Sequence, residues 1–524
     1  MPTTISSATL IGVDGHLIEV EVDLLSKLPS ISIVGLPDGA VRESGDRVRS
    51  AIEQSGFPFP RKRVVVNLAP ASIKKQGTVF DLPIAIAILH AQYLSTSVQN
   101  NKACPSSSWI ETRLLQTIFV GELSLTGQLR PIQGVLAFTI LAKNLGFQSI
   151  IVPLLNVEEA QLIEDIEIYG FQYLREVISW LQGNTHMSSE RGKTIDITPE
   201  YDCDMSEVKG QHIAKRALEI AAAGGHNILL LGSPGCGKTM LAKRLPSILP
   251  SINQNEAIDI TRIYSAAGYN QQTLLDIRPF RSPHHSVSLA GMIGNSKLIP
   301  GEVSLAHNGV LFLDELAEFR RDVLEALRVP LEDGVIHMTR ASGQISFPAQ
   351  FSLIAAANPC PCGWRLHPSI VCTCTPVMVQ RYQNRISGPL LDRIDIQVII
   401  YPTETARLLE DTQEESSEDI RSRVEKARML QQTRYLHSKY QCNAHLEGEA
   451  IWTFAHVSTE DRRWLLSVCE PQNLSARSIS RIIKVARTIA DLANTEQVTK
   501  QHLAEAFAYK SHTTTSNLEE PCSH

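Results

Sequence analysis

The chain has 524 residues, too many for one hydrophobic core, so we expect two or three domains. Apolar residues make up 43 % and charged residues 20 %, the ordinary balance of a soluble globular protein. The sequence contains no apolar run long enough for a membrane span, and its acidic N-terminus does not resemble a signal peptide. Ten cysteines without an export signal favour a reducing compartment, so we expect a cytoplasmic protein. The net charge of −6 excludes a uniformly basic surface but allows a local basic channel.

The chain divides into segments of different character. Residues 1–180 mix strand and helix patterns and predict one α/β domain, followed by a polar linker over 181–203. Residues 204–403 alternate strands with helices, 404–510 have helix periodicity and predict a helical lid, and 511–524 form a polar tail that we expect to be disordered. Within the first domain, strands are predicted over 18–22, 30–34, 64–66, 117–121 and 149–153, and helices over 41–52 and 135–145.

A phosphate-binding loop follows the buried-strand pattern of residues 227–231. Its sequence fits GxxxxGK[ST], with a helix predicted from Met240 to Leu245, before Pro246. The glycines let backbone N–H groups converge on phosphates, Lys238 reaches the β- and γ-phosphates, and the Thr239 hydroxyl ligates Mg²⁺. We therefore predict an ATP site made by Gly232, Ser233, Pro234, Gly235, Cys236, Gly237, Lys238, Thr239 and Met240.

A second apolar strand, residues 309–313, ends in the adjacent carboxylates Asp314 and Glu315. Buried strands rarely end in two acids unless a cation or a reaction uses them. Asp314 fits a partner of Mg²⁺, and Glu315 fits the base that orients the attacking water. A solvated strand end is the plain alternative, and the preceding phosphate-binding loop favours the catalytic interpretation.

Several motifs carry a family resemblance. The segments 278–285 (RPFRSPHH), 300–307 (PGEVSLAH) and 330–334 (PLEDG) resemble the magnesium-chelatase-like branch of AAA+ proteins. Together with 33–38 (IVGLPD), 66–70 (VNLAP) and 80–85 (FDLPIA), they resemble the bacterial YifB/ComM family over nearly the whole chain. This resemblance implies an AAA+ ATPase, and the family is associated with DNA branch migration during natural transformation.

The resemblance also implies roles for residues outside the phosphate-binding loop. Asn358, at the end of a buried strand, resembles the first sensor, which helps to position the attacking water. Arg393 resembles the arginine presented to a neighbouring subunit's γ-phosphate, although an ordinary helix-end ion pair would also explain it. Arg477 looks like the second sensor, and Gly210 and Gln211 lie where such motors hold adenine.

The N-terminal domain resembles the Lon protease domain, which has the ribosomal S5 domain 2-like fold. In this sequence Val79 and Leu136 fall where the nucleophile and its base would be. Aliphatic side chains cannot supply or activate a nucleophile, so we predict an inactive relative used for binding or assembly. Its basic runs 61–63 and 74–75 are candidate phosphate contacts, with a solvated face as the alternative.

Four cysteines lie within 15 residues, in two CxC pairs that follow Asn358. Four thiolates satisfy tetrahedral Zn²⁺, so we predict a zinc site in an insert over 360–374. His367 could replace one ligand, and a cysteine-rich loop without metal is the other possibility. The predicted ligands are Cys360, Cys362, Cys372 and Cys374.

Residues 334–348 alternate around a turn and predict a β-hairpin, which faces the central channel in related ring helicases. We predict DNA phosphate contacts from Arg340 in this hairpin, and from His284 and His285 in the preceding segment. A solvated surface is the alternative for these side chains.

The predicted function is an ATP- and Mg²⁺-dependent DNA motor that acts on single-stranded or branched DNA. A trans-acting Arg393 implies a homo-oligomer, and the resemblance implies a hexamer. The alternatives are a chelatase-type motor subunit, an ATP-driven protein-remodelling factor, and a nucleotide-switched scaffold. A chelatase role lacks a recognisable metal-adhesion motif in the sequence, and a protease role is opposed by Val79 and Leu136.

Overall fold

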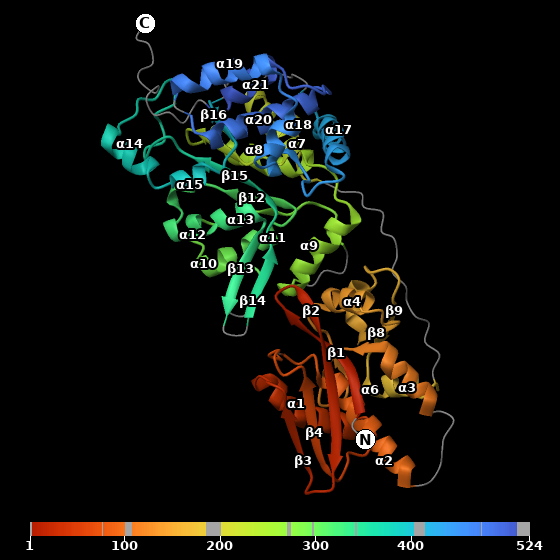
Figure 1. Cartoon of the computed structure of the whole chain (residues 1–524). Helices are drawn as coiled ribbons and strands as arrows, with labels where there is room; N and C mark the ends of the chain where they lie inside the picture. Colours follow the sequence, from red (N-terminus) through yellow and green to blue (C-terminus); the bar gives the residue numbers. More distant parts are fainter. Residues whose placement is uncertain are drawn as a thin grey trace.

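The computed structural model shows an N-terminal α/β unit joined to a larger α/β motor unit that carries a helical C-terminal region (Figure 1). It describes residues 3–75, 77–99, 107–184, 201–269, 274–295, 298–340, 343–402, 414–472 and 474–510. Buried apolar residues form one core in the N-terminal unit and one core on each face of the motor's sheet. The predicted mixed α/β class with helical C-terminal residues is therefore confirmed.

The N-terminal unit is built on a four-stranded sheet in the order β1-β2-β4-β3, in which only the β3–β4 pair is parallel. Alternate residues of β4, such as Val64 and Val66, are buried, because one face of the sheet is covered by helices. A smaller parallel sheet follows, in the order β5-β8-β9. The strands are β1 Thr3–Ile11, β2 Asp14–Leu25, β3 Ser30–Val34, β4 Arg63–Ala69, β5 Thr117–Phe119, β6 Glu122–Leu123, β7 Leu129–Arg130, β8 Ser149–Pro153 and β9 Glu167–Phe171; the helices are α1 Gly39–Gln54, α2 Asp81–Gln99, α3 Ser107–Gln116, α4 Val135–Asn144, α5 Val157–Ala160 and α6 Leu174–Leu181.

The motor unit contains a parallel five-stranded sheet in the order β11-β12-β15-β10-β16. Its inner strands are continuous apolar runs because both faces are buried; Leu230 packs into one core and Leu229 into the other. All five strands point the same way, so their carboxyl ends meet at one edge. The strands are β10 Ile228–Gly232, β11 Phe280–Arg281, β12 Gly309–Leu313, β15 Phe351–Ala357 and β16 Ile396–Ile400.

Helices and a separate hairpin surround this sheet. The hairpin, β13 Val335–Arg340 with β14 Gly343–Pro348, is antiparallel as predicted and projects toward the N-terminal unit (Figure 1). The helices are α7 His212–Gly224, α8 Lys238–Ile248, α9 Gln254–Ala266, α10 Leu289–Ile293, α11 Glu302–Leu305, α12 Arg321–Ala326, α13 Arg328–Asp333, α14 Pro376–Gln383 and α15 Gly388–Leu391, with 3-10 turns η2 Met205–Glu207 and η3 Leu316–Glu318.

The C-terminal helices share a core with α7 and α8 of the motor, so the described lid residues pack directly on the P-loop helix. They are α17 Ser417–Tyr435, α18 Glu449–Ala455, α19 Thr459–Cys469, α20 Ala476–Leu492 and α21 Lys500–Ala508, with the short turns η4 Asn443–His445 and η5 Glu470–Gln472. Ser475 caps α20, because its side chain accepts a hydrogen bond from the backbone N–H of Ser478.

Several predicted elements have other bounds in the structure, such as the strand predicted over 18–22, which spans Asp14–Leu25, and the structure adds β1 and α2, which were not predicted. The strand predicted over 117–121 ends at Phe119, and the helix after the phosphate-binding loop continues through Pro246 to Ile248. Pro246 lacks the N–H that would bond the carbonyl of Ala242, and its ring crowds that carbonyl, so the helix ends two residues later. Residues 185–200 of the predicted linker and the predicted disordered tail, 511–524, lie outside the described residues, and the predicted domain boundaries stay predictions. No helix within the described ranges is long and apolar enough to cross a membrane.

The N-terminal unit contacts the motor through α9 and the β13–β14 hairpin (Figure 1). Val13, in the turn between β1 and β2, is buried in the same core as Phe347 of β14. Two polar contacts accompany this packing: Arg262 Nη1 lies 2.8 Å from Asp14 Oδ1, and Ser265 Oγ donates to Glu159 Oε1 at 2.5 Å. The hairpin is therefore held between the two units.

Glu159 makes this contact pH-sensitive. Burial raises the pKa of its carboxyl, while hydrogen bonds from Ser265, the backbone of Leu136 and Asn156 partly oppose the rise. A carboxyl with a raised pKa stabilises the fold fully below its ordinary pKa, and this contribution is lost as the pH rises through the raised value.

We therefore predict that Glu159→Gln gains thermal stability relative to the parent as the pH rises from about 4 to 8. The expected gain is about 1.4 kcal/mol for each unit by which folding raises the pKa. Thermal unfolding followed by circular dichroism at several pH values measures the difference. A difference that stays constant or shrinks across this range would contradict the prediction.

Candidate ATP site and cysteine cluster

The phosphate-binding loop lies at the carboxyl edge of the motor's sheet, where β10 ends at Gly232 and α8 begins at Lys238. Gly235 and Gly237 have φ values of +78° and +93°, a backbone region that glycine adopts without strain. The N-terminus of α8 therefore faces the concave side of the loop. Backbone N–H groups and the helix dipole at this position suit an anion such as a phosphate.

Lys238 is held inside this loop. Its Nζ donates to the carbonyls of Gly232 at 2.7 Å and Ser233 at 2.9 Å, and to Asn358 Oδ1 at 3.1 Å. Burial lowers the pKa of the Lys238 amine, partly opposed by nearby Cys236 and Asp314. These three oxygens hold the Lys238 ammonium inside the loop. The phosphate oxygens of a bound nucleotide would replace them as acceptors of its hydrogen bonds.

The two predicted carboxylates lie beside the loop. Thr239 Oγ1 donates to Asp314 Oδ2 at 2.8 Å, so the two predicted Mg²⁺ partners meet although they are 75 residues apart. Glu315 has a φ of +52°, which is strained for a residue with a side chain and is typical of functional sites. Asn358 follows β15, the strand between β12 and β10, so it is placed between the carboxylates and Lys238.

His285 lies beside the predicted ATP site, a position that sequence reasoning missed. Its Nδ1 is 3.6 Å from Glu315 Oε2, and its ring lies 4.0 Å from that of His284. We predicted both histidines as DNA contacts, and this stays a prediction; the structure places His285 next to Glu315, the predicted base, with His284 against the His285 ring. Residue spacing in the sequence could not reveal the contact between His285 and Glu315, because the contact depends on the pairing of β11 with β12. The side chain of Arg340, the third predicted DNA contact, lies outside the described residues.

Arg393 and Arg477 lie at the other end of the sheet. Arg393 precedes β16, whose Ile396 pairs with Ile228 at the start of β10, whereas Lys238 follows the end of β10. Four strand steps separate the two ends by about 13 Å. Both arginines line one cavity of about 660 Å³, in which Glu332 forms an ion pair with Arg393. Neither arginine is therefore brought to the chain's own phosphate-binding loop.

A buried polar network joins this arginine face to the lid. His226, just before β10, contacts Asp395 Oδ2 through Nδ1 at 3.1 Å and Thr488 Oγ1 through Nε2 at 2.8 Å. Arg481 Nε, one turn along α20 from Arg477, lies 3.5 Å from the other oxygen of Asp395. A movement of α20 would therefore also move the Arg393 turn.

Gly210 and Gln211, the predicted adenine contacts, lie where the motor joins the lid. The N–H of Gly210 donates to Glu414 Oε1 at 2.8 Å, and Gln211 Nε2 donates to the carbonyl of Tyr401 at 2.7 Å. The 3-10 turn just before them contacts α8, the helix that begins at Lys238. Their position fits a nucleotide base that bridges motor and lid.

The four predicted zinc ligands are brought together. The Sγ atoms of Cys360, Cys362 and Cys372 lie 3.4 to 3.6 Å apart, and all four sulfurs lie within 4.8 Å of one another. Four thiolates at 2.3 Å from one Zn²⁺ would have edges of about 3.8 Å, so the arrangement fits a tetrahedral metal. His367 is not part of this group, because its Nδ1 accepts from the backbone N–H groups of Ser369 and Ile370.

The cysteine cluster packs against the phosphate-binding loop. Gly363 has a φ of +82°, and a Cβ at this position would lie 2.6 Å from Cδ of Pro234. Gln383 of α14 donates to the carbonyl of Pro359 at 3.5 Å, which fixes the start of the insert. The insert that carries the cluster therefore packs against the phosphate-binding loop through Gly363 and Pro234.

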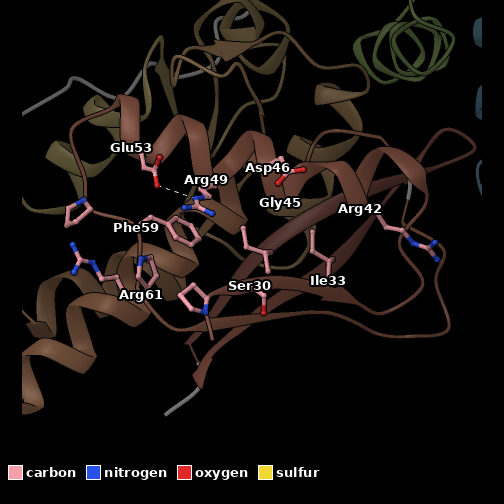
Figure 2. Close-up of a pocket in the computed structure, with 13 residues that line it drawn as sticks. Ser30, Ile33, Arg42, Gly45, Asp46, Arg49, Glu53, Phe59 and Arg61 are labelled. Carbon is pink, nitrogen blue, oxygen red and sulfur yellow. Dashed lines mark hydrogen bonds and ion pairs between the residues drawn. The ribbon is translucent and has the colours of Figure 1, made fainter. Parts of the chain in front are cut away.

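The N-terminal unit has a groove of its own, between α1 and the edge strand β3 (Figure 2). Figure 2 shows Arg49 paired with Glu53, and the Arg49 guanidinium also lies 5.5 Å from the centroid of the Phe59 ring. Val79 and Leu136 are buried core residues, in agreement with their predicted inability to act as nucleophile and base. Lys75 is also fully buried, so the prediction that it contacts phosphates is wrong. Its Nζ instead donates to the carbonyl of Pro70.

Comparison with known proteins agrees with this architecture. Residues 204–408 match the family described as magnesium chelatase, subunit ChlI; residues 20–156 match subunit ChlI of Mg-chelatase, and 414–510 its C-terminal region. The protein YifB of Escherichia coli is 42 % identical over 95 % of both chains. Competence protein ComM of Haemophilus influenzae is 41 % identical over 96 % of both chains.

The chain belongs to the YifB/ComM family. It is a magnesium-chelatase-like AAA+ ATPase, and this family membership implies ATP and Mg²⁺. A distant relative, the maternal DNA replication licensing factor mcm6 of Xenopus tropicalis, is 21 % identical over 54 % of this chain and 32 % of its own length.

We predict that Gly363→Ala weakens ATP binding about tenfold, because the added methyl group displaces Pro234 from the phosphate-binding loop. Gly39→Ala, which has no atom within 4 Å of the added carbon, is the matched control. Fluorescence titration with an ATP analogue measures the dissociation constant of each variant. Unchanged ATP affinity in Gly363→Ala would show that ATP binding does not depend on the contact between Gly363 and Pro234.

Proposed function

We propose that the protein is an ATP-driven DNA motor that works as a ring, in the manner of a branch-migration helicase. The observation that carries the ring is the separation of Lys238 from Arg393 and Arg477 by the length of the sheet. Each ATP site is then completed by a second copy. A closed ring of six copies gives every site the same neighbour.

Each residue of the site has a defined task in this proposal. Lys238 binds the β- and γ-phosphates, and Thr239 and Asp314 hold Mg²⁺, which neutralises the charge on the phosphates. Glu315 orients the attacking water, with Asn358 beside it. Arg393 and Arg477 of the neighbouring copy would then stabilise the charge that develops on the γ-phosphate.

Two observations support DNA as the partner. A relative that is 41 % identical bears the name competence protein, and a distant relative bears that of a DNA replication licensing factor. The β13–β14 hairpin projects from the motor, and its Arg340 is the proposed phosphate contact. His284 and His285 would then link this part of the motor to Glu315.

We further propose that Cys360, Cys362, Cys372 and Cys374 bind one structural Zn²⁺. The separation of their sulfurs supports this, as does the partial exposure of Cys362, Cys372 and Cys374, whose free thiols would be open to oxidation. When bound, the metal would fix the loop that supports Pro234.

A chelatase-type motor subunit is the second candidate, favoured by the family models that match most of the chain. In that role the same ATP site would drive partner proteins that insert a metal into a porphyrin.

We predict that the purified protein with ATP and Mg²⁺ moves a labelled four-way DNA junction, and that Lys238→Ala abolishes movement while leaving the fold intact. Gel analysis of the separated strands measures this, with ATP turnover recorded in parallel. Hydrolysis of ATP without binding or movement of the junction would contradict the DNA proposal and favour the chelatase-type role.

We predict one Zn²⁺ per chain, measured by plasma mass spectrometry on protein purified without added metal. Cys372→Ser with Cys374→Ser should lose the metal, whereas Cys203→Ser, away from the cluster, should keep it. A parent protein without stoichiometric zinc, when prepared under reducing conditions, would refute the metal site.

A further inference from the structure

The strand β3 forms a free edge of the sheet in the N-terminal unit. In the order β1-β2-β4-β3, only β4 pairs with β3 among the strands that the structure describes. The residues Ser30–Val34 include neither a charged residue nor a proline, the two features with which proteins usually protect such an edge. Large apolar side chains on both sides of β3 are exposed: Leu28 is 87 % exposed and Leu36 59 %. This edge can therefore accept a further strand from another chain.

A groove of about 760 Å³ runs between this edge and α1 (Figure 2). Ile31 and Ile33 of β3 line one side of the groove, and Phe59, which stands between two prolines, lines one end. Neither Val79 nor Leu136 lines it. The groove is therefore separate from the positions where the resemblance to the protease domain would place a nucleophile and its base.

Charged side chains of α1 form the opposite wall of the groove. Four of them, spaced three or four residues apart, lie along one side of the helix: Arg42, Asp46, Arg49 and Glu53. Arg49 is engaged within the chain, because its Nε lies 3.3 Å from Glu53 Oε1 and its guanidinium lies over the Phe59 ring. The charges of Arg49 and Glu53 therefore offset each other.

The other charged side chains of the groove are Arg42, Asp46 and Arg61. Among the described residues, neither Arg42 nor Arg61 has an ion pair or a side-chain hydrogen bond, although Asp46 is one helical turn from Arg42. Figure 2 shows the two arginines toward opposite ends of the groove. Three arginines and two carboxylates leave one net positive charge, which complements a ligand with carboxylates at both ends. Asp46 and Glu53 would repel a continuous phosphate backbone, so the charges favour an acidic peptide over nucleic acid.

We propose that the α1–β3 groove binds an extended segment of a partner protein, which adds to β3 as a further strand and directs acidic side chains toward Arg42 and Arg61. This inference goes beyond the proposed function, because it gives the N-terminal unit a protein partner of its own.

The groove sets the length and the pattern of the segment that it binds. The helix rises about 16 Å between Arg42 and Glu53, a distance that about five residues of extended chain cover. Main-chain hydrogen bonds to the free edge of β3 supply affinity, and side chains on alternate positions supply specificity. Apolar side chains in the middle of the segment pack on Ile31 and Ile33, and the acidic side chains at its ends reach the two arginines.

Fluorescence polarisation with the full-length protein tests this binding. The probe is a labelled nonapeptide with two glutamates at each end of a Val-Thr-Val-Thr-Val centre. It should bind the parent, and Arg42→Glu should weaken the binding about tenfold or more. A second nonapeptide with lysines in place of the glutamates should bind the parent about tenfold more weakly, and Arg42→Glu should reduce this difference. Arg175→Glu, at an exposed position in α6 of the same unit, is the matched control and should bind both probes like the parent. Thermal unfolding confirms that each variant is folded.

Methylation of the probe's amide nitrogens tests strand addition. At a sheet edge only every second residue directs its N–H group toward the neighbouring strand. Methylation of one alternate set of nitrogens should therefore abolish binding, and methylation of the other set should not. The same result with both sets would overturn strand addition.

Three other results would overturn the proposal. One is a glutamate probe that does not bind the parent, and another is equal binding of this probe by the parent and Arg42→Glu. The third is tighter binding of a nine-nucleotide thymidine oligomer that Arg42→Glu abolishes, because the groove would then take nucleic acid instead of a protein segment.

Discussion

The parallel sheet of the motor is the constraint on which the other features depend. Because all five strands run the same way, the ends of β10, β12 and β15 place Lys238, Asp314 and Asn358 at one edge. The same rule places Arg393 at the opposite edge, before β16 begins. The shared strand direction therefore places the phosphate-binding residues together at one edge of the sheet, and Arg393 and Arg477 away from them. In the proposed function, association with a second copy brings Arg393 and Arg477 to the phosphate-binding residues.

Buried polar contacts carry this arrangement beyond the sheet. The His226–Asp395–Thr488 contacts connect the arginine turn to α20 of the lid, and Glu414 connects the lid side to Gly210. Unpaired polar groups are costly in such surroundings, so these contacts favour concerted movement of lid and arginine turn. At the other end of the motor, the β13–β14 hairpin packs against the N-terminal unit. Any movement of the hairpin during ATP turnover would therefore be resisted or transmitted by that unit.

The sequence predicts the ATP site well because its signals are local. Gly232 to Thr239, and Asp314 with Glu315, each follow a buried strand, and the structure joins them through the hydrogen bond from Thr239 to Asp314. The four cysteines are also close in sequence, so their meeting could be expected. Three features could not be predicted: the position of His285 beside Glu315, the burial of Lys75, and the packing of Gly363 on Pro234. Each depends on strand pairing or on contacts between distant segments, which residue spacing does not encode.

The central claim is that one copy supplies the phosphate-binding loop and the next supplies the arginine. Mixing two inactive variants, Lys238→Ala and Arg393→Ala, tests it most directly when ATP turnover is measured as a function of their ratio. Mixed assemblies contain interfaces with an intact Lys238 facing an intact Arg393, so turnover should reappear and be greatest near equal amounts. Assemblies that mix, as shown by light scattering or energy transfer between labelled variants, yet remain inactive at every ratio would contradict the account.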